Sequence, residues 1–243
     1  MSRTGTIIAA LLCTAAADSR AVKIERNSAV LDFTYEWPAE ASAIPALDRK
    51  FQAEAAALYR RSLILAREDH KIYQQQQRGS IADFYSKQWT TAGESRKLLS
   101  LKYQRSAYTG GAHPNTDYGV LLWDRARRRQ ITVWDLFLRP QTLSALMRTP
   151  YCQALDSERR KRRGKDWKLG LAEFNACPKF TDLAIAPVDG NRNGRFDAVA
   201  FIASPYLAGP YSEGKYETVL PVTRQLIAAL RPEYRNSFEA QRQ

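Results

Sequence analysis

The strongest constraint on the fold of this chain is an alternating stretch that is followed directly by a long amphipathic one. From Leu31 to Trp37 apolar and polar residues alternate, which predicts a half-buried strand that Pro38 ends. From about 44 to 77 apolar residues recur at helical spacing, interrupted only where Ser62 sits on the stripe. We therefore expect one long helix that packs an apolar face on the core and exposes a charged, glutamine-rich face.

Shorter strand-like and helical runs follow this helix. Pro140 and Pro150 each look like the first-turn proline of a separate short helix, and Thr223 looks like the cap of a final amphipathic helix. Strand-like runs lie at 84–91, 99–104, 118–123, 131–133, 196–203 and 216–222. Because strands and helices do not strictly alternate, the sequence predicts an α+β fold. We expect an antiparallel sheet with a long N-terminal helix and segregated C-terminal helices.

Residues 1–17 have the composition of an export signal. Arg3 provides a positive charge, 7–12 a short apolar core and 15–17 a run of small residues. A poorly formed buried strand is the alternative interpretation of so short an apolar run. Cys13 allows a lipoprotein variant, in which a lipid on that cysteine anchors the chain to the membrane. We expect a periplasmic protein that reaches the membrane only through such an anchor.

The chain is strongly basic, with a formal net charge of +12 at pH 7. Loss of the signal would remove Arg3 and no acid, which lowers the charge to +11. Such a protein is attracted to anionic surfaces by a field that salt screens beyond about 8–10 Å. In a cell envelope these surfaces are lipid headgroups, lipopolysaccharide phosphates and peptidoglycan carboxylates. Nucleic acid, the usual partner of so basic a chain, is not expected for an exported protein.

Two cysteines, Cys152 and Cys177, follow the signal. An even pair in an oxidising compartment predicts a disulfide, whereas in the cytosol the same pair would be two buried thiols. The bridge would close a loop of 24 intervening residues. On the chain-entropy model such a loop stabilises the fold by about 3–4 kcal/mol.

Two segments, 108–118 and 205–214, are rich in turn residues and aromatic residues. In the first, Gly110 and Gly111 permit backbone angles that other residues avoid, and Pro114 directs the chain. Structural packing is the simpler interpretation of each segment alone. We hypothesise that the two meet in space and form one recognition surface. The residues expected to contact a ligand there are Tyr108, His113, Asn115, Tyr206, Tyr211 and Glu213.

Catalytic and metal chemistry have little support in the sequence. The two histidines, His70 and His113, are too few for a zinc site of several histidines, and no cofactor is expected. His113 has no accompanying serine or cysteine nucleophile motif, so a hydrogen-bonded loop residue or a ligand contact is the better interpretation. Glu213 among tyrosines resembles a glycosidase acid with a raised pKa. That chemistry needs a second positioned carboxylate, which the sequence does not identify.

The loop 189–197 spaces its oxygen-bearing side chains as calcium loops do. However, Ala200 stands where the bidentate glutamate of an EF-hand is required, and Arg192 and Arg195 add positive charge at the loop. We therefore interpret it as a polar turn before the next strand and expect no metal. The weak calcium candidates are Asp189, Asn191, Asn193 and Asp197.

Basic residues are concentrated at 125–129 and 158–165, and the second run lies between the two cysteines. Such runs are usually solvated faces, but this clustering suggests a patch for an anionic ligand. We expect that replacing its arginines with glutamine weakens binding without unfolding the protein. The arginines of this predicted patch are Arg159, Arg160, Arg162 and Arg163.

Three motifs, in this order, resemble a bacterial envelope family: Gly110-Gly-Ala-His113, Trp134–Phe137 and Tyr206–Gly214. The family comprises the extracytoplasmic domain of RsiV-type anti-sigma factors and the non-catalytic part of PdaC-type peptidoglycan deacetylases. The resemblance covers nearly all of the chain after the signal. It implies a PdaC-like strand–helix–strand module at 18–92 and an RsiV-like glycine-loop module at 93–243, packed as one globular unit.

RsiV-type domains act as receptors for lysozyme, so the resemblance implies recognition more than catalysis. The sequence lacks the membrane helix and the sigma-binding region of those receptors, so signalling of that kind is not expected. We expect an exported, non-catalytic envelope protein that binds a cell-wall component or a wall-acting protein such as lysozyme. An anionic ligand is expected to be preferred over a basic lysozyme. The alternatives are a carbohydrate-active hydrolase that acts on peptidoglycan and a purely structural lipoprotein.

Overall fold

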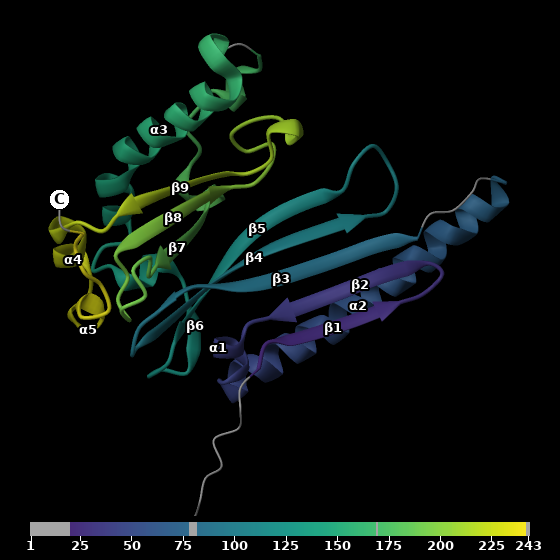
Figure 1. Ribbon diagram of the computed structural model, residues 1–243, viewed down its shortest axis with the longest axis horizontal. Helices are drawn as coiled ribbons and strands as arrows, with labels where there is room; N and C mark the ends of the chain where they lie inside the picture. Colours follow the sequence, from purple (N-terminus) through teal and green to yellow (C-terminus); the bar gives the residue numbers. More distant parts are fainter. Residues whose placement is uncertain (1–19, 78–81, 169, 242–243) are drawn as a thin grey trace, which may run out of the picture.

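Two β-sheets, each covered by one long helix, form the protein in the computed structural model (Figure 1). The structure describes residues 20–77, 82–168 and 170–241. The expected export signal and Cys13 lie outside these residues. None of the helices in the described part of the chain is long and apolar enough to span a membrane.

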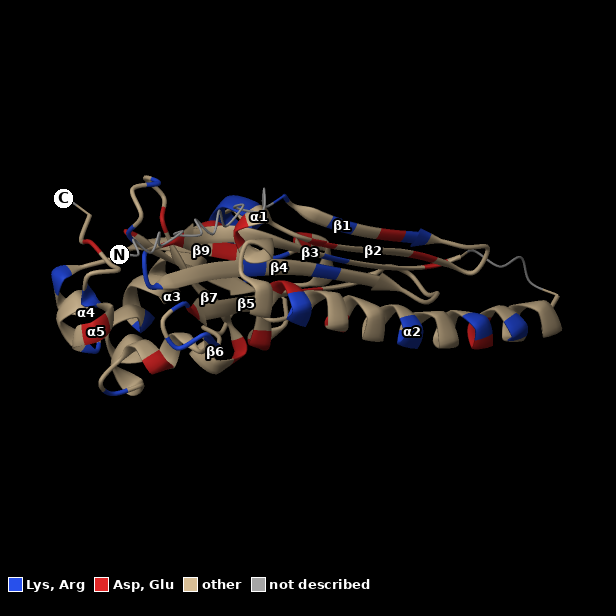
Figure 2. Cartoon of the chain, turned by 90° about the horizontal axis from the view of Figure 1, so that it is seen from below, with Lys and Arg blue, Asp and Glu red and all other residues tan. Residues whose placement is uncertain are grey.

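The larger sheet, sheet I, has six strands in chain order. Its helix α2 lies beneath the strands, and the far end of α2 extends beyond them (Figures 1 and 2). The strands are β1 (Val22–Asn27), β2 (Leu31–Trp37), β3 (Asp83–Glu94), β4 (Leu98–Tyr108), β5 (Asn115–Asp124) and β6 (Arg129–Ile131). The short helix α1 (Ala39–Ser42) and the long helix α2 (Pro45–Gln75) connect β2 to β3.

The smaller sheet, sheet II, has the order β7-β8-β9 and is covered by α3. Its strands are β7 (Ala184–Val188), β8 (Ala198–Ala203) and β9 (Tyr216–Pro221). The helices of this half are α3 (Gln141–Arg163), α4 (Arg224–Ala229) and α5 (Pro232–Arg235). Five 3-10 turns link these elements: η1 (Val133–Leu136), η2 (Gly164–Asp166), η3 (Ala172–Phe174), η4 (Phe180–Asp182) and η5 (Tyr211–Glu213).

The α+β prediction is confirmed, including the long N-terminal helix and the C-terminal helices. The sheets are antiparallel except at one place, where β2 pairs with β3 in parallel, with Leu31 opposite Asp83. A helix running back along the sheet returns the chain to the end where β2 began, so the next strand runs in the same direction. The Thr223 cap is also confirmed, because its side chain accepts a hydrogen bond from the Leu226 N–H.

The prediction of two short helices opened by Pro140 and Pro150 is wrong. The single helix α3 contains Pro150 in its interior, and Pro140 precedes its first residue. Pro150 removes one backbone hydrogen bond, but the buried stripe continues past it at intervals of four residues. This stripe consists of Leu143, Met147, Tyr151, Leu155 and Arg159. Burial of that stripe is the physical reason why the helix persists. The strands β1 and β7 were not predicted.

Two hydrophobic cores divide the molecule, and β4 contributes to both. Leu99 packs with α2 and the long strands of sheet I, whereas its neighbour Leu98 packs with α3 and sheet II. Successive side chains of a strand point to opposite faces, so sheet I is buried on both faces at this end. The expected module boundary between 92 and 93 falls within β3, where the pairing with β4 shifts register between Thr91 and Gly93.

Candidate functional site

The segment 108–118, here the glycine loop, is the hairpin between β4 and β5. Gly110 and Gly111 have φ angles of +94° and +104°, in the region that favours glycine. The Tyr108 hydroxyl donates a hydrogen bond to the Gly111 carbonyl at 3.0 Å. The Tyr108 ring stacks on Phe84 of β3. The Tyr108 side chain therefore stabilises the conformation of the hairpin.

The segment 205–214, here the tyrosine loop, reaches the glycine loop from sheet II. The His113 ring stacks on the Tyr211 ring with centroids 3.6 Å apart and an angle of 11° between the planes. The His113 Nε2 atom lies 2.9 Å from the Tyr206 hydroxyl. The two loops do meet, as we hypothesised from the sequence. We call His113, Tyr206 and Tyr211 the aromatic cluster.

Hydrogen bonding assigns the tautomer of His113. Its Nδ1 atom lies 2.9 Å from the Pro114 carbonyl, which can only accept, so Nδ1 carries the proton. The Nε2 atom of the neutral ring is then an acceptor, and the Tyr206 hydroxyl donates to it. This arrangement orients the rings of His113 and Tyr206. The two nitrogens of His113 are occupied by a backbone carbonyl and a tyrosine hydroxyl.

Tyr206 has an unusual backbone. Its φ is 70°, a left-handed conformation that is unfavourable for a bulky residue. A hydrogen bond from its N–H to the Gly209 carbonyl closes the turn. The side chain is still 54% exposed. Strain of this kind is often found at functional sites, where the surrounding structure holds a side chain in one orientation.

A groove extends from the aromatic cluster across the α2-facing side of sheet I. It consists of two adjoining pockets of about 290 and 220 Å³ that share Tyr85, Arg105 and Ala107. The larger pocket is bounded by the tyrosine loop and the first residues of β5. The smaller pocket is bounded by the middle of α2. We call the two pockets together the polar groove.

Polar side chains from three strands line this groove. Asp83 and Tyr85 come from β3, and Arg105 forms an ion pair with Asp117, the residue opposite it on β5. Of the residues predicted to contact a ligand, Asn115, Tyr206 and Tyr211 line the larger pocket. Ser62 of α2 lines the smaller one.

Sequence reasoning missed the groove. Its signals were present: Ser62 interrupts the apolar stripe of the helix, and charged residues occupy inward positions of β4 and β5. These signals could not be combined before the strands were paired.

Burial shifts the acidity of two groups in the groove. It raises the pKa of Tyr85 to about 12, although the nearby Arg105 acts in the opposite direction. Burial also raises the pKa of Asp83 to about 6, and the negative charge of Asp69 on α2 adds to this shift. The Tyr85 hydroxyl is neutral at physiological pH, and Asp83 becomes partly protonated as the pH falls toward 6.

Glu213 does not lie free in the tyrosine loop. Arg163 binds its carboxylate through two nitrogens, at 2.9 and 2.8 Å, and Tyr216 donates a further hydrogen bond to it. Burial raises the pKa of Glu213, but these donors outweigh burial and leave the pKa below its usual range. A glycosidase acid requires the opposite shift. Glu213 therefore lacks the raised pKa that the hydrolase alternative requires, and its contacts stabilise the loop.

The predicted basic patch is mostly structural. Arg159 is fully buried, and its guanidinium donates to the carbonyls of Ala208, Asn175 and Ala176 and to Asp156. The expectation that it forms part of a surface patch is wrong, because it lies on the buried stripe of α3.

Only part of the predicted patch reaches the surface. Arg163 is occupied by Glu213, and Arg162 donates to the carbonyls of Glu213 and Lys215. Arg160 is exposed and lies over the Trp167 ring. Substitution of all four arginines would therefore disturb the fold as well as the surface charge.

The predicted disulfide is confirmed. Cys152 and Cys177 are bonded, with their Cα atoms 5.6 Å apart. The bridge connects α3 to the segment that supplies the Asn175 and Ala176 carbonyls to Arg159. The bridge and the buried guanidinium therefore hold the same piece of chain.

The loop 189–197 is a self-bonded polar turn. The Asp189 carboxylate accepts hydrogen bonds from the Asn193 and Gly194 N–H groups. The Asp197 carboxylate accepts from the Gly190 N–H and from Gln241. Asn191 and Asn193 both donate to Glu239. Among the described residues, no group of three or more His, Cys, Asp and Glu side chains could hold a metal ion.

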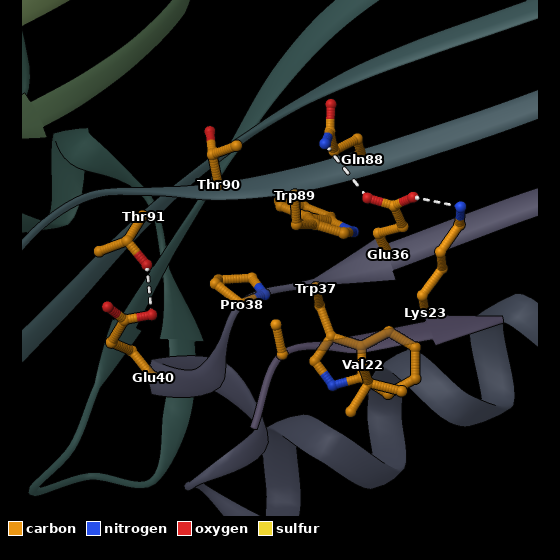
Figure 3. A pocket seen from close by; sticks show the side chains of 11 residues that line it. Val22, Lys23, Glu36, Trp37, Pro38, Glu40, Gln88, Trp89, Thr90 and Thr91 are labelled. Atoms are coloured by element: carbon orange, nitrogen blue, oxygen red, sulfur yellow. Dashed lines mark hydrogen bonds and ion pairs between the residues drawn. The ribbon is translucent and has the colours of Figure 1, made fainter. Parts of the chain in front are cut away.

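A further pocket, of about 370 Å³, lies where β2 ends beside β3 (Figure 3). Its polar side chains pair with one another. Gln88 donates to Glu36 at 3.2 Å, Lys23 lies 3.7 Å from the same carboxylate, and Thr91 donates to Glu40 at 3.0 Å. With these groups mutually satisfied, this pocket is a weaker candidate than the polar groove.

Comparison with solved structures identifies the fold. The chain is similar to a DUF3298 family protein from Pseudomonas aeruginosa PAO1, with a TM-score of 0.56 and 15% identity over 93% of this chain and 99% of that chain. It is also similar to a DUF3298 family member from Bacteroides fragilis NCTC 9343, with a TM-score of 0.51 and 14% identity over 89% and 95%. No family model and no curated protein matches the sequence. At such low identity the likeness shows a shared fold alone.

Proposed function

We propose that this chain is an exported cell-envelope protein that binds a cell-wall component through the aromatic cluster and its surroundings. The observation that carries the proposal is Tyr206, a strained and exposed residue. Its hydroxyl is hydrogen-bonded to His113, which lies 93 residues earlier in the sequence. A surface held in one conformation loses little entropy when it binds a partner. Exposed tyrosines also provide an apolar face and a hydroxyl that suit sugars.

Binding is better supported than hydrolysis. Glu213 is neutralised by Arg163 and has a lowered pKa, so it is a poor proton donor. His113 uses Nδ1 on a backbone carbonyl and Nε2 on a tyrosine. Neither group has the arrangement of a general acid or a general base. We therefore propose a recognition role, in keeping with the resemblance to RsiV-type and PdaC-type domains, and a periplasmic location.

Net charge favours an anionic partner. The basic residues are spread over both halves of the molecule, for example along α2, on β1 and at α4 (Figure 2). The attraction therefore arises from the total charge of +12, or +11 after signal removal. A basic lysozyme would approach against this field. Binding to a wall ligand should weaken as salt is added, whereas binding to a basic protein should be accelerated by salt.

Co-sedimentation with purified peptidoglycan sacculi tests the proposal, with released reducing sugar measured in the same samples. We expect the wild type to sediment with sacculi and to release no sugar. Tyr206→Ala should sediment markedly less. Leu138→Ala is the control, because Leu138 is also 54% exposed but lies outside the two loops. Equal losses in both variants, or no sedimentation of the wild type, would contradict the proposal. Sugar release would favour the hydrolase instead.

A further inference from the structure

Three buried polar atoms of the polar groove lack a hydrogen-bond partner among the described residues, and we call such atoms open atoms. They are the Asp83 Oδ2, the Tyr85 hydroxyl and the Asp117 Oδ1. None has a partner at good hydrogen-bond geometry within the described part of the chain, although Asp69 lies near Asp83 and Arg105 lies near Tyr85. Asp83 is 5% exposed and Tyr85 8%. Buried polar atoms are nearly always paired, because an unpaired one costs about 1–3 kcal/mol. Three such atoms along one groove indicate a partner other than the described residues.

The position of these atoms is built into the sheet. The face of sheet I that α2 covers is apolar where Leu101 lies opposite Leu121 and becomes polar where Arg105 lies opposite Asp117. The helix does not fill this polar end. Ser62 leaves space on its inner side, and Leu65 remains 43% exposed at the rim of the groove. The groove is thus a gap between two elements whose facing residues do not satisfy each other.

The open atoms specify the chemistry of the occupant. Two are carboxylate oxygens, which accept hydrogen bonds, and the third is a neutral hydroxyl. The partners of the two carboxylates must be donors, such as hydroxyl or amide N–H groups, whereas the tyrosine hydroxyl can donate or accept. The rings of Phe84, Tyr85 and Tyr211 offer apolar surfaces in the same groove. Several hydroxyl groups on a ring with an apolar face describe a sugar.

We propose that the polar groove binds a glycan chain, with Tyr85, Asp83 and Asp117 as its hydrogen-bonding residues. This inference rests on the proposed function and specifies its ligand: the sugar backbone of the wall rather than its anionic groups. The two pockets together have a volume within the range of about 300–1,000 Å³ that is typical of ligand sites. A chain that enters the larger pocket would continue past Tyr206 and Tyr211, so the aromatic cluster would extend the same binding site.

Calorimetric titration with uncharged tetrasaccharides tests the inference. The probes are the tetramer of N-acetylglucosamine and maltotetraose, which distinguish an amino-sugar chain from other glycans. We expect the tetramer of N-acetylglucosamine to bind the wild type and maltotetraose not to bind it. Tyr85→Phe should weaken that binding by about 3- to 10-fold, because it removes one hydrogen bond. Asp117→Asn should also weaken it.

The matched control is Tyr151→Phe. The Tyr151 hydroxyl is also buried without a partner among the described residues, but it lies in the α3 core against Phe180 and Phe201. This variant should bind as the wild type does. Equal affinity of Tyr85→Phe and wild type, or no binding of either sugar, would overturn the inference and leave water as the groove's occupant. Wild-type sedimentation with sacculi in that case would keep the proposed function intact.

Discussion

The two halves of the molecule differ in whether their buried polar groups have hydrogen-bond partners. On the α3 side, Arg159 is fully buried and bonded to Asp156 and three backbone carbonyls. On the α2 side, Asp83 and Tyr85 are almost as deeply buried, yet each keeps an atom without a partner in the described residues. A satisfied buried group holds a fold together, whereas unsatisfied ones side by side leave room for a ligand.

Isolated open atoms also occur on the α3 side, at Tyr151 and Thr218. They lie in the packed core instead of a groove. The comparison therefore depends on the clustering of open atoms beside a cavity and not on their occurrence alone. The following predictions test each side of this comparison, beginning with the largest expected effect.

Arg159→Gln should destabilise the protein most, by about 3–5 kcal/mol. Shortening the side chain removes the guanidinium donors from the carbonyls of Ala208, Asn175 and Ala176, breaks the ion pair with Asp156 and opens a cavity in the α3 core. Urea denaturation followed by circular dichroism measures the effect. Arg160→Gln is the control, because this neighbour is exposed and should change stability by at most about 0.5 kcal/mol. Similar values for the two variants would contradict the structural role of Arg159.

Removal of the disulfide by the double variant Cys152→Ser, Cys177→Ser should cost about 3 kcal/mol. The bridge holds the segment whose carbonyls bind Arg159, so the two losses should not add independently. Denaturation of the combined variant measures this coupling. Strict additivity would show that the bridge and the guanidinium act on separate parts of the structure.

Asp83→Asn should change the pH dependence of stability. The pKa of Asp83 is raised from 3.8 to about 6, so its protonated form is favoured in the folded state. The resulting stabilisation is fully present below about pH 4 and is lost as the pH rises through 6, a change of about 2–3 kcal/mol. The asparagine variant cannot ionise and should lack this loss. Unfolding free energies at pH 4 and pH 8 measure it, and parallel curves for both proteins would refute the prediction.

Tyr85→Phe should have the smallest effect on stability, within about 1 kcal/mol and in either direction. The hydroxyl has no partner at good hydrogen-bond geometry among the described residues. Its removal therefore breaks at most a weak contact with Arg105 and relieves a buried polar atom. The thermal midpoint measures the change. A large destabilisation would show that the hydroxyl is satisfied in solution, and it would remove the contrast between the two halves.

Several features could be predicted from local patterns. Alternation identified β2, helical periodicity identified α2, and Thr223 identified the start of α4. The pairing of Cys152 with Cys177 followed from their number and from the expected oxidising compartment. The first three depend on residues close together in the chain. For the disulfide, each of the two cysteines after the signal had only one possible partner.

Only the tertiary structure decided how distant segments meet. The parallel return of β3, the burial of Arg159 and the contact between His113 and Tyr211 all depend on where the long helices place the chain. A charged run such as 158–165 has the same composition whether one of its arginines faces water or a core. Local periodicity determines which residues share a face. What covers that face is set by packing between segments far apart in sequence, which is why the polar groove could not be predicted from the sequence alone.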